Sequence, residues 1–331
     1  MGVGSFNLGS GRPFTESILK TAFLFPGQGS QYSGMMDAFD RPEEKRRIAE
    51  ASEILKADLF KISRNDPPGI LDRTCWTQPA ILVASILALD RLRDDSPPDM
   101  VLGHSLGEYT ALVCASALSF SDAVRVVHER GRFMQDAVPE GEGLMAAVLG
   151  PEREKIEEIL SRVMAERKES STVGVANDNC PGQCVIAGKK ETVLRAIDAL
   201  KEAGVRKVVP LSVSVPSHTP LMHRAALSMK ETLSKISLAP LTVPLIPNVT
   251  AQPIGPGSFG PEISDLLVRQ LESPVEWTRS MTVIYAQGVT RCVEVGPGTV
   301  LTGLGKRIER SIGTLTEKIL WESTDRKEEG A

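Results

Sequence analysis

The stretch VLGHSLGEYTALVCASAL, residues 101–118, places one serine between two glycines where a short apolar run gives way to a helical pattern. Ser105 is the centre of G-x-S-x-G, which is typical of a nucleophile elbow, a strained turn that exposes a serine between a strand and a helix. Residues 100–102 predict the end of a strand, and residues 108–118 contain helix formers without glycine or proline. The order of strand, turn and helix that the motif requires is therefore present.

The same serine has a second interpretation. Ser105 followed three positions later by Glu108 is also a capping box, in which a hydroxyl and a carboxylate bind free backbone amides at a helix start. That pattern is common before an apolar run, so this segment alone leaves both interpretations open. If the serine reacts, the amino end of the helix favours the negative charge that develops there.

Composition restricts the class of protein. The chain has 331 residues, 41% of them hydrophobic and 24% charged, which predicts a globular protein of one large domain or two. A net charge of −4 without a long basic block argues against nucleic acid as the main partner. The longest apolar stretch, residues 111–118, is too short to cross a bilayer. Residues 1–18 lack the apolar centre of a signal peptide, and five irregularly spaced cysteines indicate reduced thiols, so we expect a cytoplasmic protein without a metal site.

Two different patterns of predicted helices and strands follow one another along the chain. A strand in 21–31, helices near 43–57, 79–93 and 121–136, and the elbow predict an α/β core with a mostly parallel sheet. Between 143 and 213 the expected order is βαββαβ, which is the ferredoxin-like arrangement, and α/β signals then return. The predicted organisation is as follows: a flexible extension over 1–18, a core over 19–142 and 214–315, an inserted subdomain over 143–213, and a tail over 316–331.

A reactive serine needs a base, because its hydroxyl is a weak nucleophile. The four histidines are His104, His128, His218 and His223. His104 adjoins the serine and should point to the opposite side, and His128 falls on the polar side of its helix. His218 lies between two prolines in a loop after the inserted segment, which favours it as the base over His223. A solvent-facing loop histidine is the alternative.

Arg130 occupies an unusual position on its predicted helix. At ~100° per residue, positions 123, 126, 127, 133 and 134 all lie within ~60° of it, and all five are apolar. A buried charge needs a partner, because an unpaired ion in the interior is very costly. Either a structural salt bridge or the carboxylate of a ligand satisfies that need, and both remain open here.

Eight short motifs occur in one order between residues 21 and 310, nearly the whole chain. They are FPGQGSQ, TQPA, GHSLGEY, RGRFMQ, NCPGQCVIAG, VPSH, VRQLESPVEWT and EVGPG. In this order they resemble the malonyl-CoA:acyl-carrier-protein transacylases of fatty acid synthesis. The resemblance implies an α/β-hydrolase-like core with an inserted ferredoxin-like subdomain.

The resemblance also implies roles for particular residues. Ser105 is expected to accept the acyl group, His218 to act as base, and Arg130 to hold the malonyl carboxylate. Backbone amides of Gln28 and Leu106 are expected to form the oxyanion hole. The remaining expected site residues are Gln270, whose backbone carbonyl orients the histidine in place of a carboxylate, and Asn177, Asn179, Asn248 and His104, near the cleft.

The implied reaction is a ping-pong transfer that needs no metal or redox cofactor. Its partners are malonyl-CoA and an acyl carrier protein, with neither nucleic acid nor membrane. Carrier proteins are usually acidic, so candidate docking residues are the basic ones on the subdomain and last helix: Lys189, Lys190, Arg206, Lys207, Lys306, Arg307 and Arg310. A serine hydrolase would share the elbow and base without the arginine, and a non-catalytic docking protein would be expected to lose Ser105 or His218.

Overall fold

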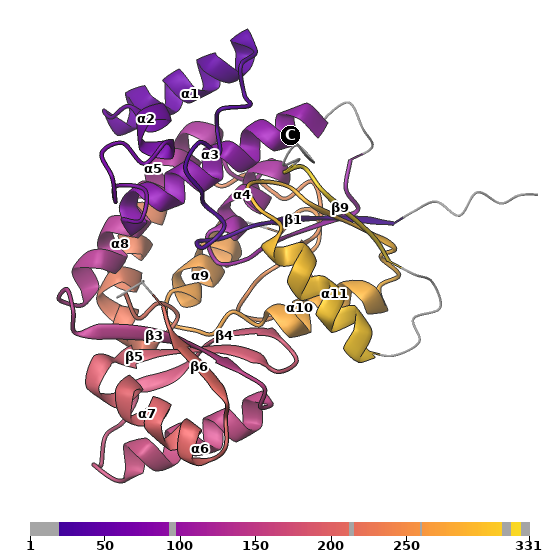
Figure 1. Ribbon diagram of the computed structural model, residues 1–331. Helices are drawn as coiled ribbons and strands as arrows, with labels where there is room; N and C mark the ends of the chain where they lie inside the picture. Colours follow the sequence, from indigo (N-terminus) through magenta and orange to yellow (C-terminus); the bar gives the residue numbers. More distant parts are fainter. Residues whose placement is uncertain (1–19, 93–96, 212–214, 259, 313–318, 326–331) are drawn as a thin grey trace, which may run out of the picture.

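The computed structural model describes residues 20–92, 97–211, 215–258, 260–312 and 319–325. Two sheets organise them, a five-stranded parallel sheet in the upper part of Figure 1 and a four-stranded antiparallel sheet in the lower part. The predicted combination of a parallel α/β core with a separate βαββαβ unit is confirmed.

The parallel sheet has the strand order β7-β2-β1-β8-β9. Its strands are β1 (Thr21–Phe25), β2 (Met100–Gly103), β7 (Leu245–Ile246), β8 (Arg291–Glu294) and β9 (Leu320–Ser323). Successive side chains of a strand point to opposite faces, so β1 contributes to two cores. Phe23 and Phe25 pack among most of the helices, and Ala22 and Leu24 pack against the last two.

Helices cover both faces of this sheet. On the face of Phe23 lie α1 (Pro42–Leu55), α2 (Leu59–Ser63), α3 (Thr74–Leu92), α4 (Gly107–Cys114), α5 (Phe120–Ala137), η1 (Pro220–Met222), α8 (His223–Leu233) and α9 (Gly260–Gln270). On the other face lie α10 (Trp277–Ala286) and α11 (Val300–Ile312). In the described part of the chain, no helix has the length and apolar character that a membrane span requires.

The antiparallel sheet has the strand order β4-β5-β3-β6. Its elements are β3 (Gly143–Leu149), α6 (Arg153–Ala165), β4 (Val173–Cys180), β5 (Gln183–Lys189), α7 (Lys190–Glu202) and β6 (Lys207–Pro210). Ala146, Val148 and Ile186 pack against α6 and α7, whereas Met145 and Val185 lie on the opposite face of the sheet. That second face is turned toward the α/β core (Figure 1).

Two predicted boundaries were wrong. Residues 320–323, expected in a C-terminal tail, form β9 and pair in parallel with β8. The helix after the elbow ends at Cys114 and not at Leu118, because Ser116 adopts a left-handed φ of 59°. The expected extension over 1–18 lies outside the described residues.

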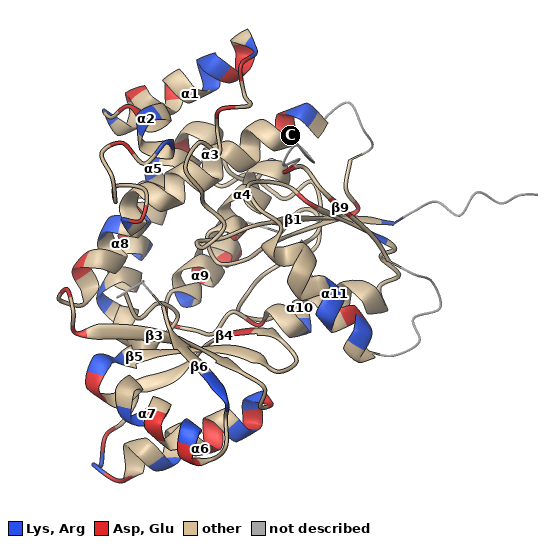
Figure 2. Ribbon diagram, viewed as in Figure 1, with Lys and Arg blue, Asp and Glu red and all other residues tan. Residues whose placement is uncertain are grey.

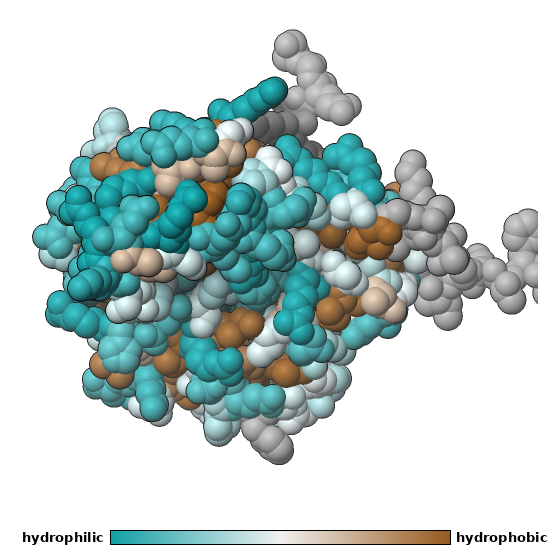
Figure 3. All heavy atoms as spheres, turned by 90° about the horizontal axis from the view of Figure 1, so that it is seen from below, coloured by the Kyte–Doolittle hydropathy of each residue, from teal (hydrophilic) through white to brown (hydrophobic). Residues whose placement is uncertain are grey.

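Charged side chains gather on the outer helices, with both signs mixed on α1, α6 and α7 (Figure 2). Seen from below, hydrophilic residues cover most of the face and hydrophobic residues form separate groups (Figure 3). The face seen in Figure 3 therefore resembles the solvated surface of an ordinary protein.

Candidate active site

The serine of the G-x-S-x-G motif lies at a tight turn between β2 and α4, at the carboxyl edge of the parallel sheet. Ser105 has a φ of 51°, in the left-handed region that is strained for a residue with a side chain. A Cβ atom on Gly103 would overlap the backbone of Gly107, and one on Gly107 would overlap the carbonyl group of Phe25. The two glycines therefore let the turn lie directly against its own helix and against β1.

The hydroxyl of Ser105 does not cap α4. Its Oγ lies 2.8 Å from Nε2 of His218, and the helix start has no side-chain cap. Glu108 turns into the core, where its carboxylate accepts hydrogen bonds from the backbone amide of Asn248 at 2.9 Å and from Nε2 of Gln270 at 3.0 Å. The capping box is not formed, so the geometry favours the nucleophile interpretation.

His218 is buried in the loop before η1, with a left-handed φ of 62°. Its Nδ1 donates to the backbone carbonyl of Gln270 at 2.7 Å. Because a carbonyl oxygen only accepts, this bond leaves Nε2 unprotonated and able to accept the proton of Ser105. Burial, and then the charge of Arg130, lower the pKa of His218 to about 3, so the imidazole is neutral at neutral pH. The side chain of His223 is instead 65% exposed.

Arg130 lies on the buried face of α5 with 1% of its surface exposed, as the helical period predicts. Nη1 donates to Oε1 of Gln78 at 2.9 Å. Nη2 donates to Oε1 of Gln270 at 2.8 Å and to Oγ of Ser105 at 3.1 Å. All three acceptors are neutral, and within the described residues this guanidinium has no carboxylate partner while its Nε–H is unpaired. A structural salt bridge therefore does not explain the buried charge, which faces the serine.

Two backbone amides beside the serine are free. The N–H groups of Gln28, in the turn after β1, and of Leu106, directly after the serine, donate to no acceptor in the described residues. Both residues line the cleft that contains Ser105. Free amides next to a nucleophile can bind the oxyanion of a tetrahedral intermediate.

Three asparagines surround the elbow in different ways. Oδ1 of Asn248 accepts the backbone N–H of Ser105 at 2.6 Å, and its Nδ2 donates at 2.6 Å to the carbonyl two residues before the serine. Oδ1 of Asn179 lies 2.9 Å from Nε2 of His104, and Asn177 lines the same cleft. Asn248 thus holds the backbone around Ser105, whereas the other two belong to the cleft wall.

The cleft has a volume of about 280 Å³ and lies between the two sheets. The uncovered face of the small sheet contributes Met145 and Val185 to its wall, and α11 contributes Leu301 and Leu304. A group attached to Ser105 is therefore surrounded by apolar side chains on one side and by a guanidinium on the other.

Two polar residues of this cluster had no site role in the sequence analysis. Gln78 lies near the start of a long apolar helix. A single amide side chain in such an apolar segment was the signal in the sequence that could have identified it as a site residue. Glu108 had a local explanation as a capping residue, which concealed its contacts with segments far along the chain.

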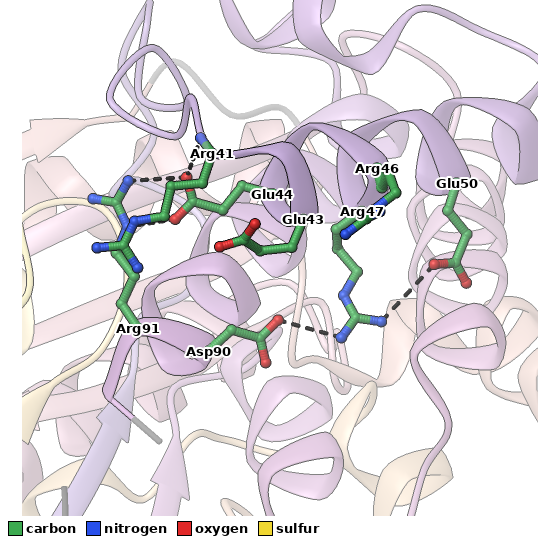
Figure 4. A pocket seen from close by; sticks show the side chains of 8 residues that line it. All are labelled: Arg41, Glu43, Glu44, Arg46, Arg47, Glu50, Asp90 and Arg91. Carbon is green, nitrogen blue, oxygen red and sulfur yellow. Dashed lines mark hydrogen bonds and ion pairs between the residues drawn. The ribbon is translucent and has the colours of Figure 1, made fainter. Parts of the chain in front are cut away.

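A second hollow lies between α1 and the end of α3 and is lined only by charged side chains (Figure 4). Arg91 binds Glu44 through Nε at 2.5 Å and Nη2 at 3.0 Å. Arg47 pairs with Asp90 at 3.3 Å and with Glu50 at 3.8 Å. These ion pairs tie α1 to α3, which is a structural role.

The α/β fold and the serine–histidine cleft are those expected of an acyltransferase, and comparison with known proteins agrees with that class. Residues 22–320 match the acyl transferase domain family, so the protein is an acyltransferase. The chain is 47% identical over 304 residues to the malonyl CoA-acyl carrier protein transacylase of Escherichia coli strain K12, an alignment that covers 90% of this chain and 95% of that protein. The chain belongs to the malonyl CoA-acyl carrier protein transacylase family, and the resemblance seen in its motifs is confirmed.

Solved structures agree with this assignment. The acyl carrier protein S-malonyltransferase of Vibrio cholerae is 40% identical with a TM-score of 0.84, and the match covers 92% of this chain and 96% of that one. A malonyl-transacylase in complex with a type II PKS acyl-carrier protein is also 40% identical, with a TM-score of 0.84 and coverage of 92% and 94%.

Proposed function

We propose that the protein transfers a malonyl group from malonyl-CoA to the phosphopantetheine thiol of an acyl carrier protein, and that Ser105 carries the group between them. His218 takes the hydroxyl proton while Oγ attacks the thioester carbon, and the amides of Gln28 and Leu106 stabilise the oxyanion. The protonated histidine then gives its proton to the sulfur of CoA. CoA leaves as the thiol, and a malonyl ester remains on the serine.

The second half of the reaction reverses these steps. The thiol of the carrier protein loses its proton to His218 and attacks the ester carbon, and the histidine returns the proton to Oγ of Ser105. Each proton and electron pair is thus accounted for by the two residues and the two thiols. We therefore propose a cytoplasmic enzyme that needs no cofactor and supplies malonyl groups to fatty acid synthesis.

The observation that carries malonyl as the substrate is that the guanidinium of Arg130 has no carboxylate partner among the described residues. It is buried, it contacts Oγ of Ser105, and its described partners are all neutral. The free carboxylate of a malonyl group can bind such a guanidinium in a bidentate manner. That contact also offsets the positive charge that lowers the pKa of His218, so the substrate strengthens the base that activates the serine.

The carrier protein is proposed to dock along α11. The amino end of this helix forms part of the cleft through Leu301 and Leu304, and the basic side chains farther along it are exposed. Arg307 also donates to Oε1 of Gln183 on the small sheet at 2.6 Å, which places its charge between the two units. Figure 2 shows blue segments on this helix. The other basic docking candidates lie on the small sheet, on α7 and, for Arg206, in the loop between α7 and β6.

Intact mass measurement after incubation with malonyl-CoA tests the proposal. We expect one malonyl adduct in the peptide that contains Ser105, its transfer to added carrier protein, and no adduct in Ser105→Ala. An adduct on Cys114 would contradict the assignment of the nucleophile. Release of free malonate without transfer to the carrier would indicate a hydrolase.

A further inference from the structure

The guanidinium of Arg130 is held from two sides by amide oxygens. Gln78 on α3 approaches Nη1 at 2.9 Å, and Gln270 on α9 approaches Nη2 at 2.8 Å. Both glutamines are buried, with exposures of 1% and 0%. These bonds fix the position of the guanidinium but add no negative charge to it.

The hydrogen bonds made by the NH₂ group of each glutamine explain why its oxygen faces the arginine. Nε2 of Gln78 donates to Sδ of Met134 at 3.4 Å. Nε2 of Gln270 donates to the backbone carbonyl of Ser105 at 3.0 Å and to the carboxylate of Glu108 at 3.0 Å. Because each NH₂ group is occupied elsewhere, the oxygens are directed to the guanidinium. Among the described residues, the hydrogen bonds that link the buried carboxylate of Glu108 to Arg130 run through the amide of Gln270, and the charge of Glu108 acts on the guanidinium across it.

Close contact between α3 and α5 brings Gln78 within reach. A Cβ atom on Gly131 of α5 would lie 2.5 Å from Cα of Cys75 on α3, so only glycine permits this approach. Pro79 has no N–H to offer the carbonyl of Cys75, and Nδ1 of His128 on α5 donates to that carbonyl instead, at 2.8 Å. The register of the two helices is therefore held at Cys75, about one helical turn before Gln78.

We propose that Gln78 is a specificity-determining positioning residue, whose neutral amide holds Arg130 in place while leaving its positive charge for the acid group of the acyl chain. A glutamate at position 78 has nearly the same shape and would pair directly with the guanidinium. Such a pair would neutralise the charge before the substrate arrives. This inference rests on the proposed function, in which Arg130 binds the malonyl carboxylate.

Competition between malonyl-CoA and acetyl-CoA tests the inference. Equal concentrations are offered to the enzyme, and intact mass gives the ratio of malonyl to acetyl adducts. Gln78→Glu should lower this ratio on the order of tenfold or more, the worth of a charge-assisted pair, without a lower melting temperature. The matched variant Gln78→Met removes the hydrogen bond but keeps the arginine charged, and should lower the ratio by only about threefold through a higher KM for malonyl-CoA.

An unchanged ratio in Gln78→Glu, or equal falls in both variants, would overturn the inference. If Gln78→Glu fails to fold, an unchanged KM for malonyl-CoA in Gln78→Met overturns it as well. A merely structural role for Gln78 predicts equal losses with malonyl-CoA and acetyl-CoA in both variants. Arg130→Ala separates this inference from the proposed function beneath it. A ratio unchanged in Arg130→Ala defeats the role of Arg130 itself, whereas a ratio changed there but not in Gln78→Glu defeats only the role of Gln78.

Discussion

Replacing Arg130 with alanine separates an arginine that recognises the substrate from one that only supports the fold. The guanidinium lies beside Oγ of Ser105 at 3.1 Å, and its other described bonds go to the amide oxygens of Gln78 and Gln270. The alanine variant removes these three hydrogen bonds and the positive charge of the guanidinium that makes them. Arg132, exposed on the same helix, provides the matched control as Arg132→Ala.

The expected magnitude follows from these contacts. A hydrogen bond to a charged group contributes about 1.5–3 kcal/mol, which corresponds to roughly 10- to 150-fold in kcat/KM for malonyl-CoA. Acetyl-CoA has no free carboxylate, so its transfer should change little. Each amide oxygen left without a donor costs about 1–3 kcal/mol of stability, whereas removal of a buried charge relieves its desolvation. We therefore expect a melting temperature lower by only a few degrees.

The assay measures kcat/KM for both thioesters, with holo carrier protein as acceptor, and thermal melting of the same samples. The ratio of malonyl to acetyl transfer should fall at least tenfold in Arg130→Ala and stay unchanged in Arg132→Ala. Equal losses with both substrates and a large fall in melting temperature would show that Arg130 is structural and refute the reasoning.

Three further predictions concern the base and the helix contact. His218→Ala should lower acylation by roughly 10²–10⁴-fold and His223→Ala should have little effect, since only the first touches the serine; loss in the second variant instead would identify the wrong histidine. Because burial and Arg130 lower the pKa of His218 to about 3, this base stays neutral as the pH falls from 8 to 5, and the acid limb of kcat/KM that it sets should lie well below 6.5. Burial raises the pKa of Glu108 to about 7, so this carboxyl group titrates in the same pH range as an ordinary histidine. The pH profile is therefore measured in Glu108→Gln, which removes that titration, and an acid limb that persists near 6.5 in this variant would contradict the prediction. Gly131→Ala places a methyl group against the backbone of α3 and should lower the free energy of unfolding by about 1–3 kcal/mol. The preference for malonyl-CoA over acetyl-CoA should fall as well. A normal melting temperature would show that the two helices separate without cost.

The local sequence pattern was sufficient to predict those features that depend on a single helix, strand or turn. The G-x-S-x-G spacing predicted a strand, a turn and a helix with Ser105 at the turn, because the backbone can pass so closely only where Cβ atoms are missing. The helical period placed Arg130 at the centre of a buried face, since the direction of a side chain on a helix follows from its number. The strand β9 was missed, because an edge strand with partly exposed residues is defined by its pairing with β8.

Whether Arg130 has an ionic partner, and what Glu108 does, could not be read from their own segments. The amides that hold the arginine come from positions 52 and 140 residues away, and the groups that bind Glu108 from 140 and 162 residues away. The sequence by itself determined which faces of the elements are buried and which residue stands at the elbow, because periodicity and turn chemistry are local. Only the tertiary structure decided which buried polar groups meet, because the packing of α3, α5 and α9 against one another depends on side chains spread over the whole chain.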